Sequence, residues 1–205
     1  MKKYQKVTVD TYDRTADEFT KKVESLHNIE QSKIFLNLIP KNCHILDLGC
    51  GSGRDSEIFS QKKYKVTGID LSSKMINICK KRNIDVDFRI MNILDLKFED
   101  ESFDGIWANA SFIHIPKNEF FKGLNESLRI LKKDGVMYIS LKLGNNEGIE
   151  NDDRYGIANK YMSYFSKDEI EKDLIDSGFS IIQSEIEIKY DNYANHPWIN
   201  IFVRK

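Results

Sequence analysis

The sequence predicts an α/β fold in which a mostly parallel sheet carries helices on both faces. Along the chain, apolar strand patterns alternate with helix patterns, which is typical of parallel strands joined by crossover helices. The last connection, residues 191–197, is too short for such a crossover, so it favours a hairpin and an antiparallel final strand. With 205 residues the chain is long enough for a full core, and we expect one domain over residues 1–205.

The expected elements follow in order from the N-terminus. Residues 1–40 are expected to form an N-terminal helical cap, which Pro40 and Lys41 end. Strands are expected at about 44–48, 65–70, 86–91, 103–108, 135–143, 180–190 and 198–204. Helices are expected in the intervals, at about 55–62, 73–82, 117–132 and 167–177.

Helix ends and one long loop carry their own signals. Ser166 and Glu169 form an S-x-x-E capping box at the start of the last helix, and Gly135 and Gly178 fall where helix ends need a left-handed residue. Residues 144–161 show no regular pattern and follow the fifth strand at the ligand-binding edge of the sheet. Because loops of this length inside compact domains are usually functional or disordered, we expect residues 144–165 to form a substrate lid.

The composition is that of an ordinary globular protein. Hydrophobic residues make up 40% of the chain and charged residues 31%, and 31 basic side chains nearly balance 32 acidic ones. A formal net charge of -1 implies no general attraction to nucleic acid or to a membrane surface, so neither DNA nor RNA is an expected partner. The start MKKYQKVTVD has no apolar export segment, and no stretch approaches the length of a membrane span, so a cytoplasmic location is expected.

The three cysteines show no metal-ligand spacing. Cys43, Cys50 and Cys79 are odd in number, so free thiols in a reducing compartment are expected. The sequence therefore predicts no metal site.

The most informative segment is ILDLGCGSGRD, residues 45–55. An apolar strand ends here in Asp47 and runs into Gly49, Gly51 and Gly53. Glycine tolerates positive φ and has no Cβ, so the chain can turn sharply and a ligand can lie against bare backbone. The next strand ends in Asp70, whose carboxylate can accept two hydrogen bonds from a ribose diol. Both acids fall at the carboxyl ends of strands, where ligands bind in open α/β sheets.

The glycine spacing argues against a dinucleotide site and a P-loop. A dinucleotide fingerprint reads G-x-G-x-x-G, and its third glycine would fall on Arg54 or on Ser56. The carboxylate of Asp47 would also repel a pyrophosphate. The P-loop pattern G-x-x-x-x-G-K-S/T is absent from the sequence. S-adenosylmethionine fits better, because its ammonium group would meet Asp47 while its ribose would meet Asp70.

Five segments follow one another in a characteristic order: DLGCGSG (47–53), GIDLSSKMI (68–76), FRIMNILDLKF (88–98), FDGIWANASFIHIP (103–116) and LRILKKDGVMYISL (128–141). Together they resemble the motifs of the class I S-adenosylmethionine-dependent methyltransferases. This resemblance implies a Rossmann-like three-layer sandwich with a seven-stranded, mostly parallel sheet whose last strand is antiparallel. It implies an enzyme of the small single-domain type with S-adenosyl-L-methionine as cofactor, similar to quinone-biosynthesis and tellurite-resistance methyltransferases.

The predicted cofactor-binding residues are Asp47, Gly49, Cys50, Gly51, Gly53, Asp70, Leu71, Met75, Asn92, Ile93 and Asn109. At the position of Asn92, members of this family often have an acid that receives the adenine amino group. The amide oxygen of Asn92 can accept the same hydrogen bond without charge assistance. Leu71 and Met75 are expected on the apolar face of the ring, with a simple core role as the alternative for Met75.

His114 and Tyr12 are the candidate catalytic residues. Methyl transfer needs a nucleophile held in line with the methyl carbon, and it needs a base only if that nucleophile arrives protonated. His114 is the leading candidate for such a base, because it lies in the segment that faces the transferred methyl in similar enzymes. A structural histidine bonded to a loop carbonyl is the alternative. Tyr12 begins YDRTADEF, which resembles the segment that closes over the cofactor in many relatives.

The acceptor is the least readable part of the site. Further pocket candidates are Arg154, Tyr155, Tyr161, Tyr164, His196, Trp198 and Asn200, and an inward Arg154 would suggest an anionic acceptor. Residues 109–112 lack both prolines of the motif found in methyltransferases that act on nucleobase amines, which disfavours base methylation. We expect methyl transfer to a small-molecule acceptor at an O, N, S or other atom. The alternatives are methylation of tRNA or a protein side chain, and a noncatalytic S-adenosylmethionine-binding protein.

Overall fold

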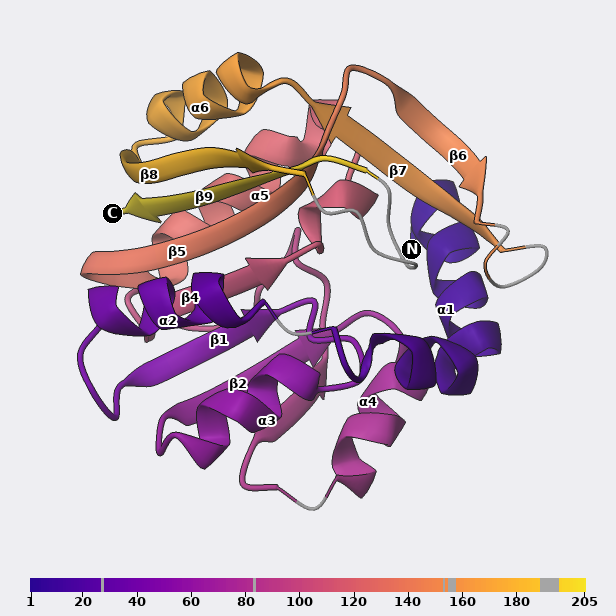
Figure 1. The fold of residues 1–205 in the computed structure, drawn as a ribbon, viewed down its shortest axis with the longest axis horizontal. Helices are drawn as coiled ribbons and strands as arrows, with labels where there is room; N and C mark the ends of the chain where they lie inside the picture. Colours follow the sequence, from indigo (N-terminus) through magenta and orange to yellow (C-terminus); the bar gives the residue numbers. More distant parts are fainter. Residues whose placement is uncertain (27, 83, 153, 155–157, 189–195) are drawn as a thin grey trace.

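The computed structural model describes residues 1–26, 28–82, 84–152, 154, 158–188 and 196–205. A mixed β-sheet runs through the middle of the molecule and carries helices on both faces (Figure 1). Its strands are β1 His44–Leu48, β2 Lys65–Asp70, β3 Asp87–Ile90, β4 Phe103–Asn109, β5 Leu131–Leu143, β6 Glu147–Asn151, β7 Asn159–Phe165, β8 Ser180–Glu187 and β9 Trp198–Arg204. The helices are α1 Lys3–Val23, α2 Ile29–Leu38, α3 Arg54–Gln61, α4 Ser73–Lys81, α5 Lys117–Ile130 and α6 Lys167–Asp176, with the 3₁₀ turn η1 at Phe112–His114.

The order of the strands confirms the predicted fold class. Strands β3, β2, β1, β4 and β5 pair in parallel, and β9 lies antiparallel to both β5 and β8. These seven strands are the predicted Rossmann-like sheet with an antiparallel last strand. The expected hairpin connection falls mainly on residues 191–195, which lie outside the described residues, but the antiparallel pairing of β8 with β9 is as predicted.

Two strands were not expected. The described part of the chain forms a sheet of nine strands, because β6 and β7 make an antiparallel hairpin within residues 144–165. The end of β7 also pairs in parallel with the end of β5, at Lys142–Leu143. The prediction of an irregular segment here was wrong. The strand pattern was hidden because the buried Lys160 occupies a position where a strand normally has an apolar residue.

The turn before the central part of β5 also differs from the prediction. Gly135 was expected at a left-handed helix end, but α5 ends at Ile130 and Asp134 takes the positive φ of 61° instead. Gly135 is needed for space, since a Cβ there would lie 2.8 Å from Cγ of Leu131. The other two end signals are confirmed: the capping box of Ser166 is present, and Gly178 has a φ of +98°.

The two faces of the sheet bury separate apolar cores. On one face, Phe35 of α2 and Phe59 of α3 pack against Trp107, whose indole stacks on Tyr138 with ring centroids 4.1 Å apart. On the other face, side chains of α5 and α6 such as Phe120 join a larger core. This three-layer packing holds the strands in place, so that their carboxyl ends form a stable platform.

Helix α1 lies beyond the carboxyl ends of the parallel strands, between α4 and β7 (Figure 1). The Thr11 hydroxyl donates to the carbonyl of Asn159 at 2.6 Å, and the amide of Tyr161 donates to Thr8 Oγ1 at 2.9 Å. At the other side, the Ser72 hydroxyl donates to Asp13. The N-terminal segment is helical as predicted, and these bonds fasten it across the edge where ligands bind. None of the helices in the described part of the chain combines the length and apolar character that a membrane span requires.

Candidate functional site

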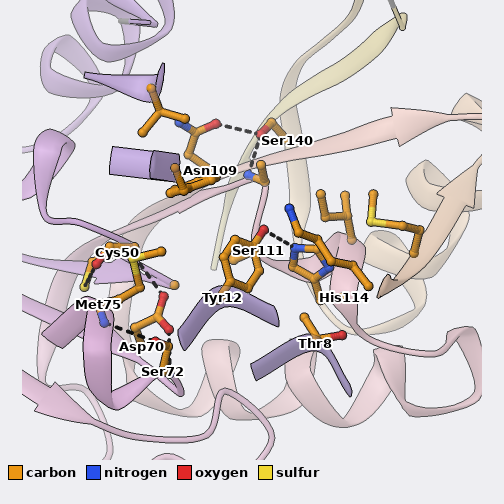
Figure 2. A pocket seen from close by; sticks show the side chains of 18 of the residues that line it. Thr8, Tyr12, Cys50, Asp70, Ser72, Met75, Asn109, Ser111, His114 and Ser140 are labelled. Atoms are coloured by element: carbon orange, nitrogen blue, oxygen red, sulfur yellow. Dashed lines mark hydrogen bonds between the residues drawn. The ribbon is translucent and has the colours of Figure 1, made fainter. Parts of the chain in front are cut away.

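A cavity of about 750 Å³ lies between the carboxyl ends of the parallel strands, α1 and the β6–β7 hairpin. Every predicted catalytic and cofactor-binding residue lines it except Gly53: Tyr12, Asp47, Gly49, Cys50, Gly51, Asp70, Leu71, Met75, Asn92, Ile93, Asn109 and His114. Residues from the first and last thirds of the chain therefore meet in one space. Figure 2 shows several of them around it.

The glycine loop has the backbone that its sequence predicts. Gly49, Gly51 and Gly53 have φ values of +79°, +53° and +82°, all in the left-handed region. The amides of Gly49 and Cys50 both donate to the carbonyl of Ile69 at 2.8 Å, which ties the loop to the end of β2. A Cβ on Gly49 would lie 2.4 Å from Cβ of Ser111, so this glycine is required for close approach as well as for its φ. Gly53 lies behind the loop as the N-cap residue of α3.

Asp70 is held firmly at the end of β2. Its Oδ2 accepts from the amide of Gly51 at 3.0 Å, and its Oδ1 accepts from the amide of Ser72 at 2.8 Å. Figure 2 shows its carboxylate among cavity residues. Each carboxylate oxygen can accept more than one hydrogen bond, so both oxygens keep acceptor capacity toward the cavity. Burial raises the pKa of Asp70, an effect that these amides oppose.

Asp47 is buried at the end of β1, with 2% of its surface exposed. Its Oδ2 accepts from the Ser56 hydroxyl at 2.6 Å. Burial and the neighbouring Asp55 carboxylate raise the pKa of Asp47 well above the usual range of a carboxyl group. A cationic ligand beside Asp47 would relieve this cost, because an opposite charge favours the ionised form.

Asp55 is the hub of a polar network that the sequence did not reveal. Arg54 donates to both of its oxygens, at 2.8 and 3.1 Å, and the indole of Trp107 donates to Oδ2 at 2.8 Å. Burial would raise the pKa of Asp55, but Arg54 and the other donors outweigh it and hold the pKa below its ordinary value. Asn109 donates to the same carboxylate at 2.9 Å, while its own oxygen accepts from Ser140 at 2.9 Å (Figure 2). These bonds make Asn109 a support for the loop after β4.

Another group of lining residues is more apolar. Met75 is buried and also lines the cavity, so both roles considered for it are compatible with its position. Asn92 accepts from the amide of Leu94 at 3.0 Å through Oδ1, which orients its side-chain amide. Leu71 and Ile93 complete this side, which offers flat apolar surface and few polar groups to a ligand.

Tyr12 and His114 form a hydrogen-bonded pair, with Oη of Tyr12 2.8 Å from Nε2 of His114 (Figure 2). Nδ1 of His114 lies 2.8 Å from the carbonyl oxygen of Tyr161, which can only accept, so Nδ1 carries the proton. Burial, together with the charges of Lys160 and Lys142, lowers the pKa of His114 to about 4. His114 is therefore neutral near pH 7, and its Nε2 accepts from the Tyr12 hydroxyl.

The end of the cavity next to this pair is rich in cations. Lys142 of β5, Lys160 of β7 and Arg154 line it, together with Asp152 and Glu150. Lys160 is only 4% exposed and pairs with Asp152 at 3.0 Å, while its ammonium lies 4.5 Å from the centre of the Tyr12 ring. Neither lysine was predicted as a site residue. Lys142 is a charged residue within the expected strand 135–143, whereas Lys160 lies in the segment that showed no regular pattern.

The remaining pocket candidates divide into two groups. Arg154, His196, Trp198 and Asn200 line the cavity. Tyr161 and Tyr164 do not line it, so these two pocket predictions were wrong; the Tyr161 hydroxyl donates to Glu147 and the Tyr164 hydroxyl donates to Glu150. Tyr155 lies outside the described residues.

Two observations indicate that the cavity is built for a ligand. The Ser111 hydroxyl is buried against the glycine loop and has no hydrogen-bond partner in the described part of the chain. The left-handed glycines also expose backbone along the cavity floor, between the carboxylates of Asp47 and Asp70. A ligand with an ammonium group, a diol and an aromatic ring fits this arrangement of donors, acceptors and apolar wall.

Comparisons with known proteins agree with this description. Residues 45–135 match the family model of a methyltransferase domain. The ubiquinone biosynthesis O-methyltransferase of Pelagibacter ubique is 35% identical over 104 residues, which are 49% of this chain and 42% of that protein. The chain spans between 34% and 54% of the length of the first three curated relatives that it matches.

Solved structures share the fold over most of the chain. The 1,6-didemethyltoxoflavin-N1-methyltransferase of Burkholderia thailandensis, solved with S-adenosylhomocysteine, has a TM-score of 0.79 at 19% identity, covering 98% of this chain and 88% of that one. The 4+2 cyclase SpnF has a TM-score of 0.77 at 16% identity, covering 96% of this chain and 94% of that one. At these identities the likeness shows the fold alone. The match over residues 45–135 and the shared fold make this chain similar to S-adenosylmethionine-dependent methyltransferases.

Proposed function

We propose that this protein transfers a methyl group from S-adenosylmethionine to a small-molecule acceptor. The observation that carries the proposal is the position of Asp47 and Asp70 on either side of a left-handed glycine loop, in the same cavity as Tyr12 and His114. The curated relatives named for ubiquinone biosynthesis and for hydroquinone methylation support a small, quinone-type acceptor.

The cofactor roles follow from the chemistry of each wall. Asp47 would receive the ammonium group, Asp70 the two ribose hydroxyls, and Leu71, Met75, Asn92 and Ile93 the adenine. When bound, S-adenosylmethionine supplies a methyl group on a sulfonium, which is already an activated leaving group. The protein then has to orient the acceptor and exclude water, and α1 and β7 enclose the cavity for this purpose.

Tyr12 and His114 would handle the proton of an acceptor that arrives protonated. The neutral Nε2 of His114 can take the proton of Tyr12 Oη while Oη receives the acceptor's proton, so the protein stores one proton on the imidazole. The bond from Nδ1 to the Tyr161 carbonyl would hold the ring in place in both states. Because burial lowers the pKa of His114 to about 4, the imidazole is ready to accept a proton at neutral pH but is a weak base.

A cavity that α1 and β7 partly cover favours a small acceptor over tRNA or a protein side chain. The hydrogen bonds between α1 and β7 close the mouth on the side of Tyr12, so a macromolecule would have to displace them. We also propose that the β6–β7 hairpin, within residues 144–165, serves as a lid over the acceptor.

Two measurements test the proposal. Calorimetry should show S-adenosylhomocysteine binding that Asp70→Ala weakens at least about tenfold, since charge-assisted hydrogen bonds contribute about 1.5–3 kcal/mol. The control is Asp85→Ala, an exposed acid away from the cavity. Labelled S-adenosylmethionine incubated with the protein and a metabolite extract should then label a small molecule. If Asp70→Ala bound S-adenosylhomocysteine as tightly as the wild type, the cofactor role of Asp70 would be rejected. If the protein bound S-adenosylmethionine tightly but labelled no acceptor in any extract, the assignment as a methyltransferase would be rejected.

A further inference from the structure

Lys142 stands out among the cations of the cavity because none of the described residues gives it a carboxylate partner. It lies at the end of β5, is mostly buried and lines the cavity. In the described part of the chain it is within 4.0 Å of no carboxylate oxygen, and the contact that the structure records for its ammonium is the ring of Tyr164, at 5.5 Å. Lys160 nearby is paired with Asp152 at 3.0 Å.

The carboxylates near Lys142 are committed to other groups. Asp152 pairs with Arg154 at 2.7 Å as well as with Lys160 at 3.0 Å. Glu150 accepts from the Tyr164 hydroxyl at 2.6 Å. Further away, Glu187 accepts from Asn200 at 2.8 Å and from Gln31 at 3.2 Å.

The described residues that line this end of the cavity include three cations, Lys142, Lys160 and Arg154, and two carboxylates, Glu150 and Asp152. Glu187 lines the cavity as well. Burial, followed by the charge of Arg154, lowers the pKa of Lys142, because both disfavour its charged form. An ammonium group that is removed from water needs either a counterion or hydrogen-bond acceptors.

The same ammonium lies close to the chemistry. The charges of Lys142 and Lys160 both act on the His114 ring, whose partner is the Tyr12 hydroxyl. A ligand anion at Lys142 would lie in the cavity that the Tyr12–His114 pair also lines. Trp198 and Met162 line the same part of the cavity and offer apolar surface to the body of such a ligand.

We propose that the acceptor is a small organic carboxylate, bound through its carboxylate to the ammonium of Lys142 with its nucleophilic atom toward Tyr12 and His114. This inference deepens the proposed function and rests on it. A singly charged carboxylate matches the single charge of Lys142, for which the described residues provide no carboxylate within 4.0 Å. Lys142 is a binding residue in this assignment, and its role requires no proton transfer.

The test uses benzoate as probe and benzamide as its neutral isostere. Both are titrated into the protein, with and without S-adenosylhomocysteine, and binding is followed by ligand-observed NMR and Trp fluorescence. Benzoate should bind saturably and at least about tenfold more tightly than benzamide, because a partly buried ion pair replaces a neutral contact. Lys142→Met should abolish this preference, and Lys142→Arg should keep most of it.

The matched control is Lys133→Met, which removes an exposed lysine from the other end of the same strand and should leave benzoate binding unchanged. Equal binding of benzoate and benzamide, undiminished benzoate binding by Lys142→Met, or no saturable benzoate binding would each overturn the inference. Phenyl phosphate binding more tightly than benzoate would also overturn it in favour of a dianion. Failure of S-adenosylhomocysteine to bind would instead count against the proposed function, and the titrations without it keep the two outcomes apart.

Discussion

The hydroxyl of Tyr12 lies 2.8 Å from Nε2 of His114, joining the first helix to the turn after β4. The carbonyl of Tyr161 in β7 fixes the imidazole from its other side, at 2.8 Å from Nδ1. Three distant segments thus determine one tautomer of one histidine. The position of α1 and the orientation of the candidate base are therefore coupled, because Tyr12 of α1 bonds His114 and Tyr161 of β7 fixes the same imidazole.

The first prediction concerns this pair. His114→Gln and Tyr12→Phe should each lower the rate of methyl transfer to a protonated acceptor by about a hundredfold, which is typical of general acid–base catalysis. Affinity for S-adenosylhomocysteine should change little. The control is Tyr161→Phe, which removes a hydroxyl bonded to Glu147 but keeps the carbonyl that holds His114. The rates are measured by single-turnover transfer of labelled methyl, and a loss of less than about tenfold in His114→Gln would remove its role as a base.

The second prediction concerns pH and stability. The pKa of His114 is lowered to about 4, so the unfolded chain binds a proton there more readily than the folded protein does. The free energy of unfolding should therefore fall as the pH drops from about 6.5 to about 4, by up to about 3 kcal/mol from this residue. His44, whose pKa burial also lowers to about 4, contributes in the same direction. Urea unfolding at several pH values should show a shallower decline in His114→Gln, and identical slopes would contradict the buried neutral imidazole.

The third prediction separates two reasons for glycine in the loop. Gly49→Ala places a Cβ 2.4 Å from Cβ of Ser111 and forces alanine into a φ of +79°. Gly51→Ala incurs only the cost of placing alanine in a left-handed conformation, because its Cβ would lie 3.9 Å from its nearest neighbour, Phe19. The left-handed conformation alone costs about 1–2 kcal/mol, so Gly49→Ala should destabilise the protein by clearly more than Gly51→Ala.

Thermal unfolding measures this difference, and Ser111→Gly in the Gly49→Ala background should restore part of the loss. Equal melting temperatures for the two alanine variants would show that the close approach to Ser111 is not a constraint. Binding of S-adenosylhomocysteine should weaken in Gly49→Ala even at temperatures where it is folded, because the loop would have to shift.

The fold could be predicted largely from sequence because its strands and breakers are local. Ile45, Leu46 and Leu48 form an apolar run that is buried on both faces, as parallel strands require. The β6–β7 hairpin could not be predicted in the same way. Its inward position 160 is a lysine that contacts Asp152 and the Tyr12 ring, and neither contact is visible along the sequence.

Some residues of the site could likewise be predicted from the sequence, and others could not. Asp47, Asp70 and the three glycines could be placed together from spacing alone, because a strand, a turn and the next strand bring them to one edge. The network of Asp55 and the cations Lys142 and Lys160 depend on contacts between residues far apart in the chain. In the sequence alone, these charged residues cannot be distinguished from ordinary surface residues.

The last prediction is that the Asp47 carboxylate lowers the stability of the ligand-free protein and strengthens the binding of the ligand's ammonium group. Burial and the Asp55 carboxylate raise the pKa of Asp47, so its ionised form is disfavoured in the folded protein without ligand. The sign follows from linkage: stability from this group is fully present below its unfolded pKa of about 3.9 and is lost as the pH rises through the raised folded value. Asp47→Asn removes the charge, while the amide oxygen can still accept from the Ser56 hydroxyl.

Asp47→Asn should therefore melt at a higher temperature than the wild type in the absence of ligand, with the gap widening toward alkaline pH. It should bind S-adenosylhomocysteine at least about tenfold more weakly, since the ammonium of that ligand loses its counterion. Added ligand should then raise the melting temperature of the wild type more than that of the variant. Thermal scans between pH 6 and 9, with and without the ligand, measure both effects. A variant that is less stable than the wild type at alkaline pH, or that keeps full affinity, would show that Asp47 is a structural acid and not the ammonium site.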